Sequence, residues 1–390
     1  MRKSTDRQYS VAVAAFLLMF ASGISQHSVA YFMDSIIQEL SCNRAVFSIF
    51  NSILSVCSVF LSPFIVPVIR RMGYRKAFLL GTIGVDLGFW VLSRLNSIWM
   101  LYLGGALIGL AQPFIIVPPV SLVNRSFPEK NGFIMGCVMA GNGVAGVVLA
   151  QLLPRVIEGI NWQAGFLTCA VCWAACTLAA NALAGHLPSG DMVEKKTSNP
   201  GEKHSDIYSL GFVMLLLCVM LKNITSTFTQ HMNIALSAQY PTERLIVLLT
   251  AFNVVLVLGK ISVGVLYDKL GAKFVLLFLI PFGSLGFLGF ITSRFYGLSL
   301  ISVALFAICC CFETVVYPLF LRQLYDRDFA SAAWGTCRAA STLGNSVGAP
   351  LWGAIYDQTG SYNLGLIASP CIITAICVYQ TCRLKKKNRL

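Results

Sequence analysis

Long apolar runs recur along almost the whole length of this 390-residue chain. Each is close to the roughly 20 residues that an α-helix needs to cross a bilayer. Charged residues make up only 12% of the sequence, against about 25% in a soluble domain. Hydrophobic residues make up 56%, and the mean hydropathy is +0.73. The sequence therefore predicts an all-α integral membrane protein with many spans.

Twelve transmembrane helices are predicted from these runs. They cover residues 10–33, 46–68, 77–95, 98–123, 132–154, 163–185, 207–235, 245–266, 273–292, 297–321, 332–355 and 362–382.

The formal net charge of +13 is unevenly distributed over these predicted spans. With the N-terminus inside, most of the excess Lys and Arg falls in cytoplasmic segments, and the outer loops are close to neutral. Because Lys and Arg are retained on the cytoplasmic side during insertion, we expect a multi-pass protein of the cell (plasma) membrane with both termini cytoplasmic. The basic residues are scattered over turns and form no recognisable binding motif, so nucleic acid is not an expected partner.

Most of the 14 cysteines lie in apolar spans, where a thiol behaves as a small hydrophobic group. Only Cys42 falls in a predicted outer loop. No disulfide framework and no metal site is therefore expected, and no cofactor.

Short stretches of the first half of the chain recur in the second half. The echoes, offset by 198 to 204 residues, are Ser25-Gln26-His27 with Thr229-Gln230-His231, Gly73 with Gly271, Gly136 with Gly335, and "NWQAGFL" (161–167) with "SYNLGLI" (361–367). Their constant order predicts a duplicated unit of six helices. We expect an N-terminal bundle over 1–185, a polar cytoplasmic linker over 186–206 and a C-terminal bundle over 207–390.

The turn "GVLYDKLGAK" (264–273) resembles the cytoplasmic Gly-x-x-x-Asp-Arg-x-Gly-Arg-Arg/Lys loop of the major facilitator superfamily. The resemblance implies the twelve-helix major facilitator fold and a cytoplasmic gate that involves Gly264, Asp268, Lys269 and Gly271. In the first half, "RRMGYRK" (70–76) keeps the basic residues but has Arg70 where the acid belongs. We therefore interpret the first copy as a basic turn that fixes topology.

Two further stretches are similar to the monocarboxylate and oxalate:formate antiporter branch of that superfamily. They are "NRSFPEKNGFIMGCVMAGNGVAG" and "GAPLWGAIYDQTGSY". The first contains the pattern Gly-x-Gly-x-x-Gly, but it lies in an apolar span without a preceding strand, so close helix packing is the better interpretation than a nucleotide site. No phosphate-binding loop and no catalytic constellation is found in the sequence, so we expect neither ATP-driven transport nor an enzyme.

Five ionisable residues other than His lie at membrane depth: Asp86, Lys222, Lys260, Glu313 and Arg338. Such residues are rare in spans and usually mark a substrate pathway or relay. Asp86 fits a structural partner better than a site.

Arg338 opens a polar stripe with Ser341, Thr342 and Asn345 at the spacing i, i+3, i+4 and i+7. The oxalate:formate branch carries arginine in helix eight and lysine in helix eleven; here Lys260 and Arg338 are exchanged. We expect both to bind a substrate carboxylate, with Gln26, Gln230 and Asn345 as further substrate-binding residues. The alternative is a structural ion pair in which Glu313 neutralises one of the cations.

Two histidines, His27 and His231, occupy equivalent positions in helices one and seven. Each is either part of a proton-sensing gate or a residue hydrogen-bonded across a helix interface, because a neutral histidine titrates near physiological pH. With Glu313 they are the candidates for coupling or counter-ion residues.

The resemblance and the buried cations together favour a secondary active transporter of small organic anions, mono- or dicarboxylates. It would work by alternating access in the lipid bilayer, coupled to protons or to anion exchange, as a monomer. An efflux carrier for neutral or hydrophobic compounds is the alternative, and it would tolerate removal of the charge at Arg338.

Overall fold

The computed structural model describes residues 2–42, 44–127, 131–184, 209–237, 239–291, 295–325 and 327–387. These residues are helical almost throughout, and no strand occurs among them. The predicted linker over 186–206 lies outside the described residues. The chain divides into two compact units, which are described separately. Unit 1 comprises Met1–Pro128, Cys137–Ser198 and Trp334–Ala339; unit 2 comprises Glu129–Gly136, Asn199–Ala333 and Ala340–Leu390.

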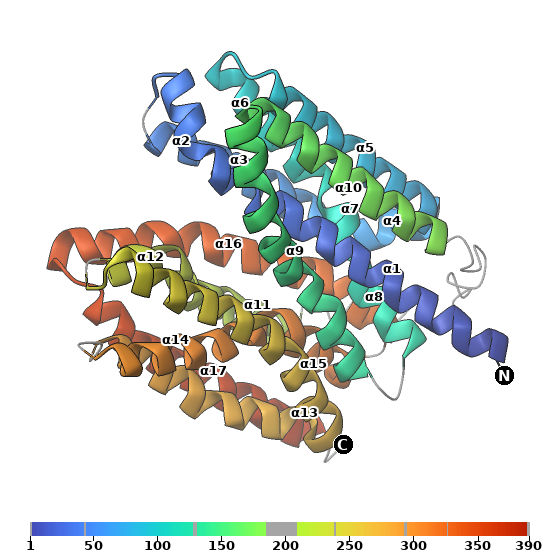
Figure 1. The fold of residues 1–390 in the computed structure, drawn as a ribbon. Helices are drawn as coiled ribbons and strands as arrows, with labels where there is room; N and C mark the ends of the chain where they lie inside the picture. The colour runs from blue at the N-terminus through green and yellow to red at the C-terminus, as the bar shows by residue number, and fades with distance from the viewer. Residues whose placement is uncertain are drawn as a thin grey trace. The chain divides into compact units, whose positions relative to one another are not determined.

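Unit 1 contains ten of the labelled α-helices and one 3-10 turn among its described residues (Figure 1). They are α1 (Arg2–His27), α2 (Val29–Glu39), α3 (Arg44–Leu61), η1 (Ser62–Phe64), α4 (Ile65–Met72), α5 (Tyr74–Ser93), α6 (Ile98–Ala111), α7 (Pro113–Ile116), α8 (Pro118–Ser126), α9 (Asn131–Gly159) and α10 (Trp162–Ala184). The first six residues of α9 belong to unit 2.

Unit 2 holds the remaining helices. They are α11 (Leu210–Ser226), α12 (Phe228–Ser237), α13 (Thr242–Ile291), α14 (Tyr296–Cys311), the π-helix η2 (Phe312–Val316), α15 (Tyr317–Leu324), α16 (Arg327–Thr359) and α17 (Asn363–Lys387). A short piece of α16, Trp334–Ala339, belongs to unit 1.

In the described part of the chain, ten helices are long and apolar enough to cross a membrane. Two of the twelve predicted spans are not among the ten. The span over 273–292 follows a break in α13 at Gly271, where φ is 77°, and its apolar part Ile280–Ile291 is short. The span over 332–355 lies within α16, whose 33 residues are long enough but include Arg338 and its polar stripe. Because of these polar residues, α16 is not apolar enough to count among the ten candidate membrane spans.

Prolines explain the interruption of one predicted span, and a second span is interrupted without a proline. The span over 98–123 is divided into α6, α7 and α8, and the breaks fall at Pro113 and Pro118. Proline has no N–H for the helical hydrogen bond and its ring clashes with the preceding turn. The span over 10–33 is also divided, at Ser28, although Ser28 keeps helical dihedral angles and bonds to Ile24. The pieces between Ile98 and Ser126 still form one candidate crossing, whereas the candidate crossing that begins at Gln8 ends at His27, just before Ser28.

An aromatic cluster lies at the centre of the core in each unit. In unit 1, the rings of Phe32 and Phe166 are 4.0 Å apart, with Phe89 against Phe166. In unit 2, the rings of Phe228 and Trp352 are 4.9 Å apart. These residues are at most 2% exposed. Helix α5 packs on α6 and α10 in unit 1, and α13 packs on α14 and α17 in unit 2 (Figure 1).

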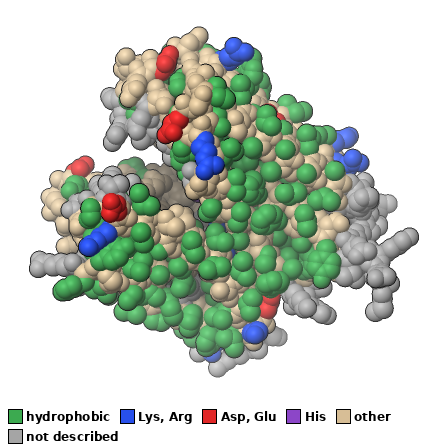
Figure 2. All heavy atoms as spheres, in the orientation of Figure 1, with side chains coloured by type: hydrophobic (Ala, Val, Ile, Leu, Met, Phe, Trp, Pro, Cys, Tyr) green, Lys and Arg blue, Asp and Glu red, His purple; other side chains and the backbone are tan. Residues whose placement is uncertain are grey.

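Large apolar side chains are also abundant on the outside. Phe60, Trp99, Val171 and Leu210 are each more than 65% exposed. Figure 2 shows hydrophobic side chains spread over the visible face, with few charged ones between them. A surface of this kind is unusual for a soluble protein and matches contact with lipid.

Candidate functional site

A polar seam joins α1 to α9 within unit 1. Asn142 Nδ2 donates to Ser22 Oγ at 3.2 Å and to Gln26 Oε1 at 3.1 Å. Asn142 Oδ1 lies 3.3 Å from His27 Nε2. Ser22 and Gln26 are one helical turn apart and therefore share a face of α1. One asparagine thus connects two predicted site residues, Gln26 and His27.

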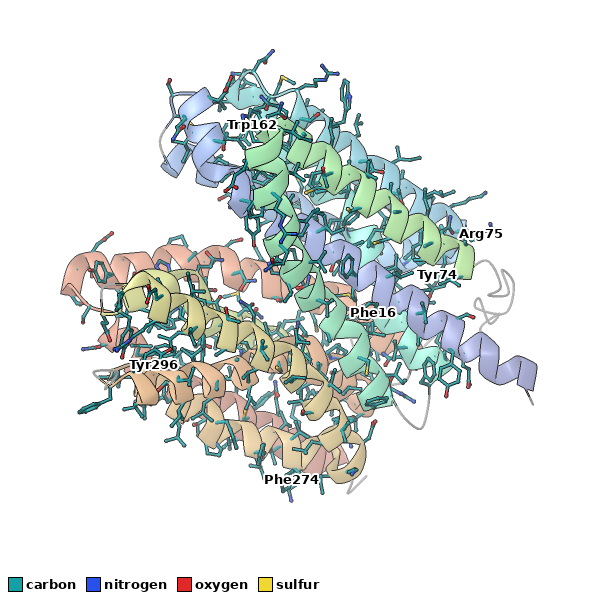
Figure 3. The ribbon with its side chains drawn as sticks, in the orientation of Figure 1. Phe16, Tyr74, Arg75, Trp162, Phe274 and Tyr296 are labelled. Atoms are coloured by element: carbon teal, nitrogen blue, oxygen red, sulfur yellow. The ribbon has the colours of Figure 1, made fainter. Side chains whose placement is uncertain are left out.

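Glycines bring these two helices close enough for the seam to form. A β-carbon on Gly23 would lie 2.5 Å from the backbone oxygen of Asn142. A β-carbon on Gly141 would lie 2.8 Å from the backbone oxygen of Phe16, whose place on α1 is marked in Figure 3. Gly141, the first glycine of "GNGVAG", therefore serves close helix packing, since only a residue without a β-carbon permits this approach.

A second polar contact extends the seam toward α6. Gln112, the residue after α6, donates from Nε2 to Ser25 Oγ at 2.6 Å, and Ser25 in turn donates to the Ser22 carbonyl. Gln112 is 3% exposed and Gln26 is exposed. The seam therefore runs from the buried amide of Gln112 to the exposed amide of Gln26, through the serines between them.

A corresponding seam joins α11 to α16 in unit 2. Thr227 Oγ1 lies 3.3 Å from Asn345 Oδ1, and Trp352 Nε1 donates to the Ile224 carbonyl at 2.9 Å. Glycines again permit the approach, because a β-carbon on Gly348 would lie 2.6 Å from Thr227 Oγ1. Asn345, a predicted site residue, is thereby fixed against the helix that precedes Gln230. Gln230 itself is exposed, in the first turn of α12.

His231 is held by two partners in unit 2. Its Nε2 lies 3.0 Å from the Ala349 carbonyl, and its Nδ1 lies 3.2 Å from Tyr362 Oη. A carbonyl only accepts, so Nε2 carries the hydrogen and the neutral ring accepts from Tyr362 through Nδ1. A protonated ring could still donate to the hydroxyl oxygen. Both histidines are therefore hydrogen-bonded across helices, as one of the two sequence interpretations expected.

Two lysines are buried inside unit 2. Lys260, in α13, is 4% exposed, and Lys222, in α11, is 1% exposed. Lys222 Nζ donates to Ser226 Oγ one turn further along α11. Lysines are almost never buried unless they are paired or functional, so each of the two is a candidate for either role.

Arg338 lies within the piece of α16 that belongs to unit 1 and is half-buried. Three residues earlier, Gly335 lies against the backbone of Ser62 and Pro63. The helix continues through Ser341, Thr342 and Asn345, so the predicted polar stripe does occupy one helix face. Arg338 and Lys260 belong to different units, and each is described within its own.

Glu313 lies in the π-helix η2, between α14 and α15. Its side chain is outside the described residues. A π-helical turn is rare and is frequently found at functional sites. The backbone conformation around Glu313 therefore keeps this residue a candidate functional residue.

The predicted gate residues gather at the end of one helical segment of α13. Asp268 accepts hydrogen bonds from the first turn of α9: Oδ1 from the N–H of Gly132 and Oδ2 from that of Phe133, both at 2.7 Å. Gly264 lies directly against the Gly132 backbone. Gly271 has the positive φ that terminates this segment, and Lys269 is exposed beside it. The first copy has Gly73 with φ 83° but Arg70 in the acid's place.

Asn142 and Gln112 are the polar residues that our sequence interpretation missed. A signal for Asn142 was present, because Gly141-Asn142-Gly143-Val144 is echoed by Gly344-Asn345-Ser346-Val347. For Gln112 no comparable pattern exists, and only its hydrogen bond to Ser25 places it in the seam.

Long apolar helices with polar seams and buried lysines at membrane depth define a multi-pass membrane protein of the carrier type. The sequence profile of the Major Facilitator Superfamily matches residues 11–327 and 210–389. This protein belongs to that superfamily, and its relatives are transporters rather than enzymes.

Similar proteins include the MFS-type transporter hasB of Aspergillus fumigatus, 22% identical over 93% of this chain and 85% of that protein. Monocarboxylate transporter 4 of Gallus gallus is 25% identical over 43% of this chain and 37% of its own length. Monocarboxylate transporter 11 of Homo sapiens is 26% identical over 25% of this chain and 21% of its own. The monocarboxylate transporters are thus matched over well under half of their length.

Two solved structures share the fold. The transporter FucP, in the outward conformation, has a TM-score of 0.70 at 13% identity and covers 95% of this chain and 98% of its own. The proton:xylose symporter XylE has a TM-score of 0.78 at 10% identity, over 96% of this chain and 95% of its own. The all-helical major facilitator fold follows from these matches.

Proposed function

We propose that this protein is a secondary active transporter of small organic anions, mono- or dicarboxylates, working by alternating access. The observation that carries the proposal is the burial of Lys260, 4% exposed in an apolar helix. An ammonium group in such a place is costly unless an anion or a partner compensates it. The similarity to monocarboxylate transporters, although limited to part of their length, supports an anionic cargo.

The two cations have different roles in this proposal. Arg338 presents a planar fork that suits bidentate binding of a carboxylate, and Lys260 acts as a point charge. Gln26, Gln230 and Asn345 supply neutral hydrogen bonds to the same substrate. Glu313, His27 and His231 are the proposed coupling or counter-ion residues, which would make transport proton-linked or an anion exchange.

The proposed membrane arrangement completes the account. It has twelve helices in two six-helix repeats, with bundles over 1–185 and 207–390, both termini cytoplasmic, and a monomer in the plasma membrane. The similar glycine contacts in the two units support the repeats: Gly136 lies against the Lys260 backbone, and Gly335 against that of Ser62.

A panel of small carboxylates and their neutral amides tests the function. Ligand binding stabilises a folded protein by mass action, so a carboxylate that binds should raise the melting temperature of the detergent-purified protein, and its amide should not. Stabilisation by neutral, hydrophobic compounds alone would favour the efflux alternative and would overturn the anion proposal.

A further inference from the structure

Asp86 lies in the central part of the candidate span formed by α5, in unit 1, and is half-buried. Its Oδ1 is buried and has no hydrogen-bond partner among the described residues. The sequence favoured a structural partner for this acid, and the described part of the chain supplies none for that oxygen. A carboxylate at membrane depth is costly unless a neighbouring group compensates its charge, and otherwise it is neutralised by a proton.

Two contacts fix the register between α5 and α10, the helix that packs beside it. Thr82 Oγ1 donates to Thr177 Oγ1 at 2.9 Å. Further along α5, the ring of Phe89 lies 6.4 Å from that of Phe166. The residue numbers rise along α5 while they fall along α10, so the two helices are antiparallel.

Trp173 lies opposite Asp86 in this register. Asp86 follows Thr82 by one helical turn, and Trp173 precedes Thr177 by one turn, so both lie on the facing sides of the two helices. Trp173 is fully buried, and its Nε1 also lacks a hydrogen-bond partner within the described ranges. An unpaired N–H donor and an unpaired carboxyl oxygen therefore occupy the same level of the interface. A water molecule between them would satisfy both groups.

Further polar groups continue this row toward the end of the interface where α5 begins, which Tyr74 marks in Figure 3. The hydrogen bond between Thr82 and Thr177 forms the next level. Asn181 follows one turn later on α10; it is 8% exposed, and its Oδ1 has no partner in the part of the chain that the structure describes. Hydrogen-bonding groups thus recur about every 5.4 Å along an otherwise apolar interface.

The helices that pack on α5 bring no positive charge to the level of Asp86. Helices α6, α7 and α10 contain no charged residue. Their titratable groups are Tyr102 in α6 and the thiols of Cys169, Cys172 and Cys176 in α10. The basic residues of α4 and α5 are all exposed and lie near the start of α5, more than ten residues before Asp86: Arg70, Arg71, Arg75 and Lys76. Among the described helices, a proton is therefore the simplest compensation for the carboxylate.

We propose that the interface of α5 and α10 is a proton-binding site, in which Asp86 takes up the proton that accompanies the transported anion. This inference rests on the proposed function, and it adds a carboxyl group of unit 1 to the coupling residues named there. The carboxylate takes the proton from bulk water and returns it to bulk water on the other side. Trp173 is a positioning residue, whose N–H holds water against Oδ1. The row through Thr82, Thr177 and Asn181 is the route to one end of the helices.

Infrared spectroscopy of the purified, full-length protein tests the protonation without any substrate. Exposed carboxyl groups are ionised at about pH 7, so the carbonyl band of a protonated carboxyl group at that pH reports a buried acid. Asp86→Asn should lose this band, and Asp357→Asn, which changes an exposed acid in α16, should keep it. Trp173→Phe removes the N–H and should shift the frequency of the band. A band of parental area in Asp86→Asn would overturn the site, and an unshifted band in Trp173→Phe would remove Trp173 from it.

Proton movement is tested with labelled propionate and butanedioate in proteoliposomes. An inward proton gradient should accelerate uptake by the parental protein and by Asp357→Asn. Asp86→Asn should lose this acceleration but still exchange labelled for unlabelled anion, because the amide resembles the neutral acid in both directions. Equal acceleration in Asp86→Asn, or exchange without any acceleration in the parental protein, would overturn the proposal. If the parental protein moves neither anion, the anion function fails instead, and the infrared band still decides whether Asp86 holds a proton.

Discussion

The backbone N–H of Gly132 lies 2.7 Å from Oδ1 of Asp268, so the carboxylate caps the first turn of α9. The second oxygen receives the N–H of Phe133 at the same distance. A carboxylate at a helix N-terminus satisfies N–H groups that have no intrahelical partner and interacts favourably with the helix dipole. This single side chain ties the end of a segment of α13 to the start of α9.

Asp268→Asn should strongly impair transport. The amide retains one acceptor, but its NH2 group must then face a backbone donor, and the charge is lost; we expect about 1 kcal/mol less stabilisation of this contact. Initial uptake rates in proteoliposomes measure the effect. Arg70→Gln is the comparison, because the first copy has no acid there, and its defect should be mild. Equal defects would show that the two turns do not differ in this way.

Gly264→Ala should destabilise the protein strongly, although it adds only one methyl group. An added β-carbon would collide with the backbone of Gly132, which cannot rotate away as a side chain could. Overpacking of this kind costs about 1–3 kcal/mol or more, so the melting temperature and the yield of monodisperse protein should both fall. Gly297→Ala is the control, since nothing lies within 4 Å of its β-carbon position. Comparable melting temperatures for the two variants would contradict this contact.

Asn142→Leu should destabilise the protein by about 1–3 kcal/mol, because it leaves polar partners on α1 without their hydrogen bonds. Asn253→Leu is the matched control: Asn253 is exposed, and its Nδ2 donates to a carbonyl of its own helix, that of Leu249. Thermal unfolding in detergent compares the two. A smaller loss for Asn142→Leu than for Asn253→Leu would refute the role given to the α1–α9 seam.

Much of the helical layout could be predicted because span length and apolarity depend only on local sequence. The break of α13 at Gly271, for example, falls inside the predicted turn over 267–272. The division of the span over 98–123 at Pro113 and Pro118 follows equally from local chemistry, although the prediction treated it as one helix. Ser28 carries no such marker, so the division of the span over 10–33 could not be predicted from local chemistry.

The candidate site was less predictable, because its contacts join residues far apart in the chain. Nothing in the neighbourhood of Asn142 shows that it bonds to Gln26, which lies 116 positions away. Charged residues in apolar runs are conspicuous, so Lys260 could be identified and was found to be buried. Neutral residues such as Gln112 are not conspicuous, and only the tertiary fold places them.

The proposed orientation predicts which cysteines are reached from outside. A thiol reagent that cannot cross membranes should label Cys42 in intact cells. In a background without Cys42, a cysteine introduced by Ser198→Cys in the predicted cytoplasmic linker should be labelled only after the membrane is made permeable. The opposite pattern would contradict the proposed orientation: the linker cysteine would be labelled in intact cells, and Cys42 of the parental protein would not.

The central claim is that Arg338 binds a substrate carboxylate. Proteoliposome uptake of a carboxylate that stabilises the protein, measured for Arg338→Gln beside Arg338→Lys, tests it most directly. We expect Arg338→Lys to retain the charge but bind more weakly, because the planar fork is gone, and Arg338→Gln to lose uptake while keeping a normal size-exclusion profile. Normal folding together with carboxylate uptake at the parental rate in Arg338→Gln would contradict the account.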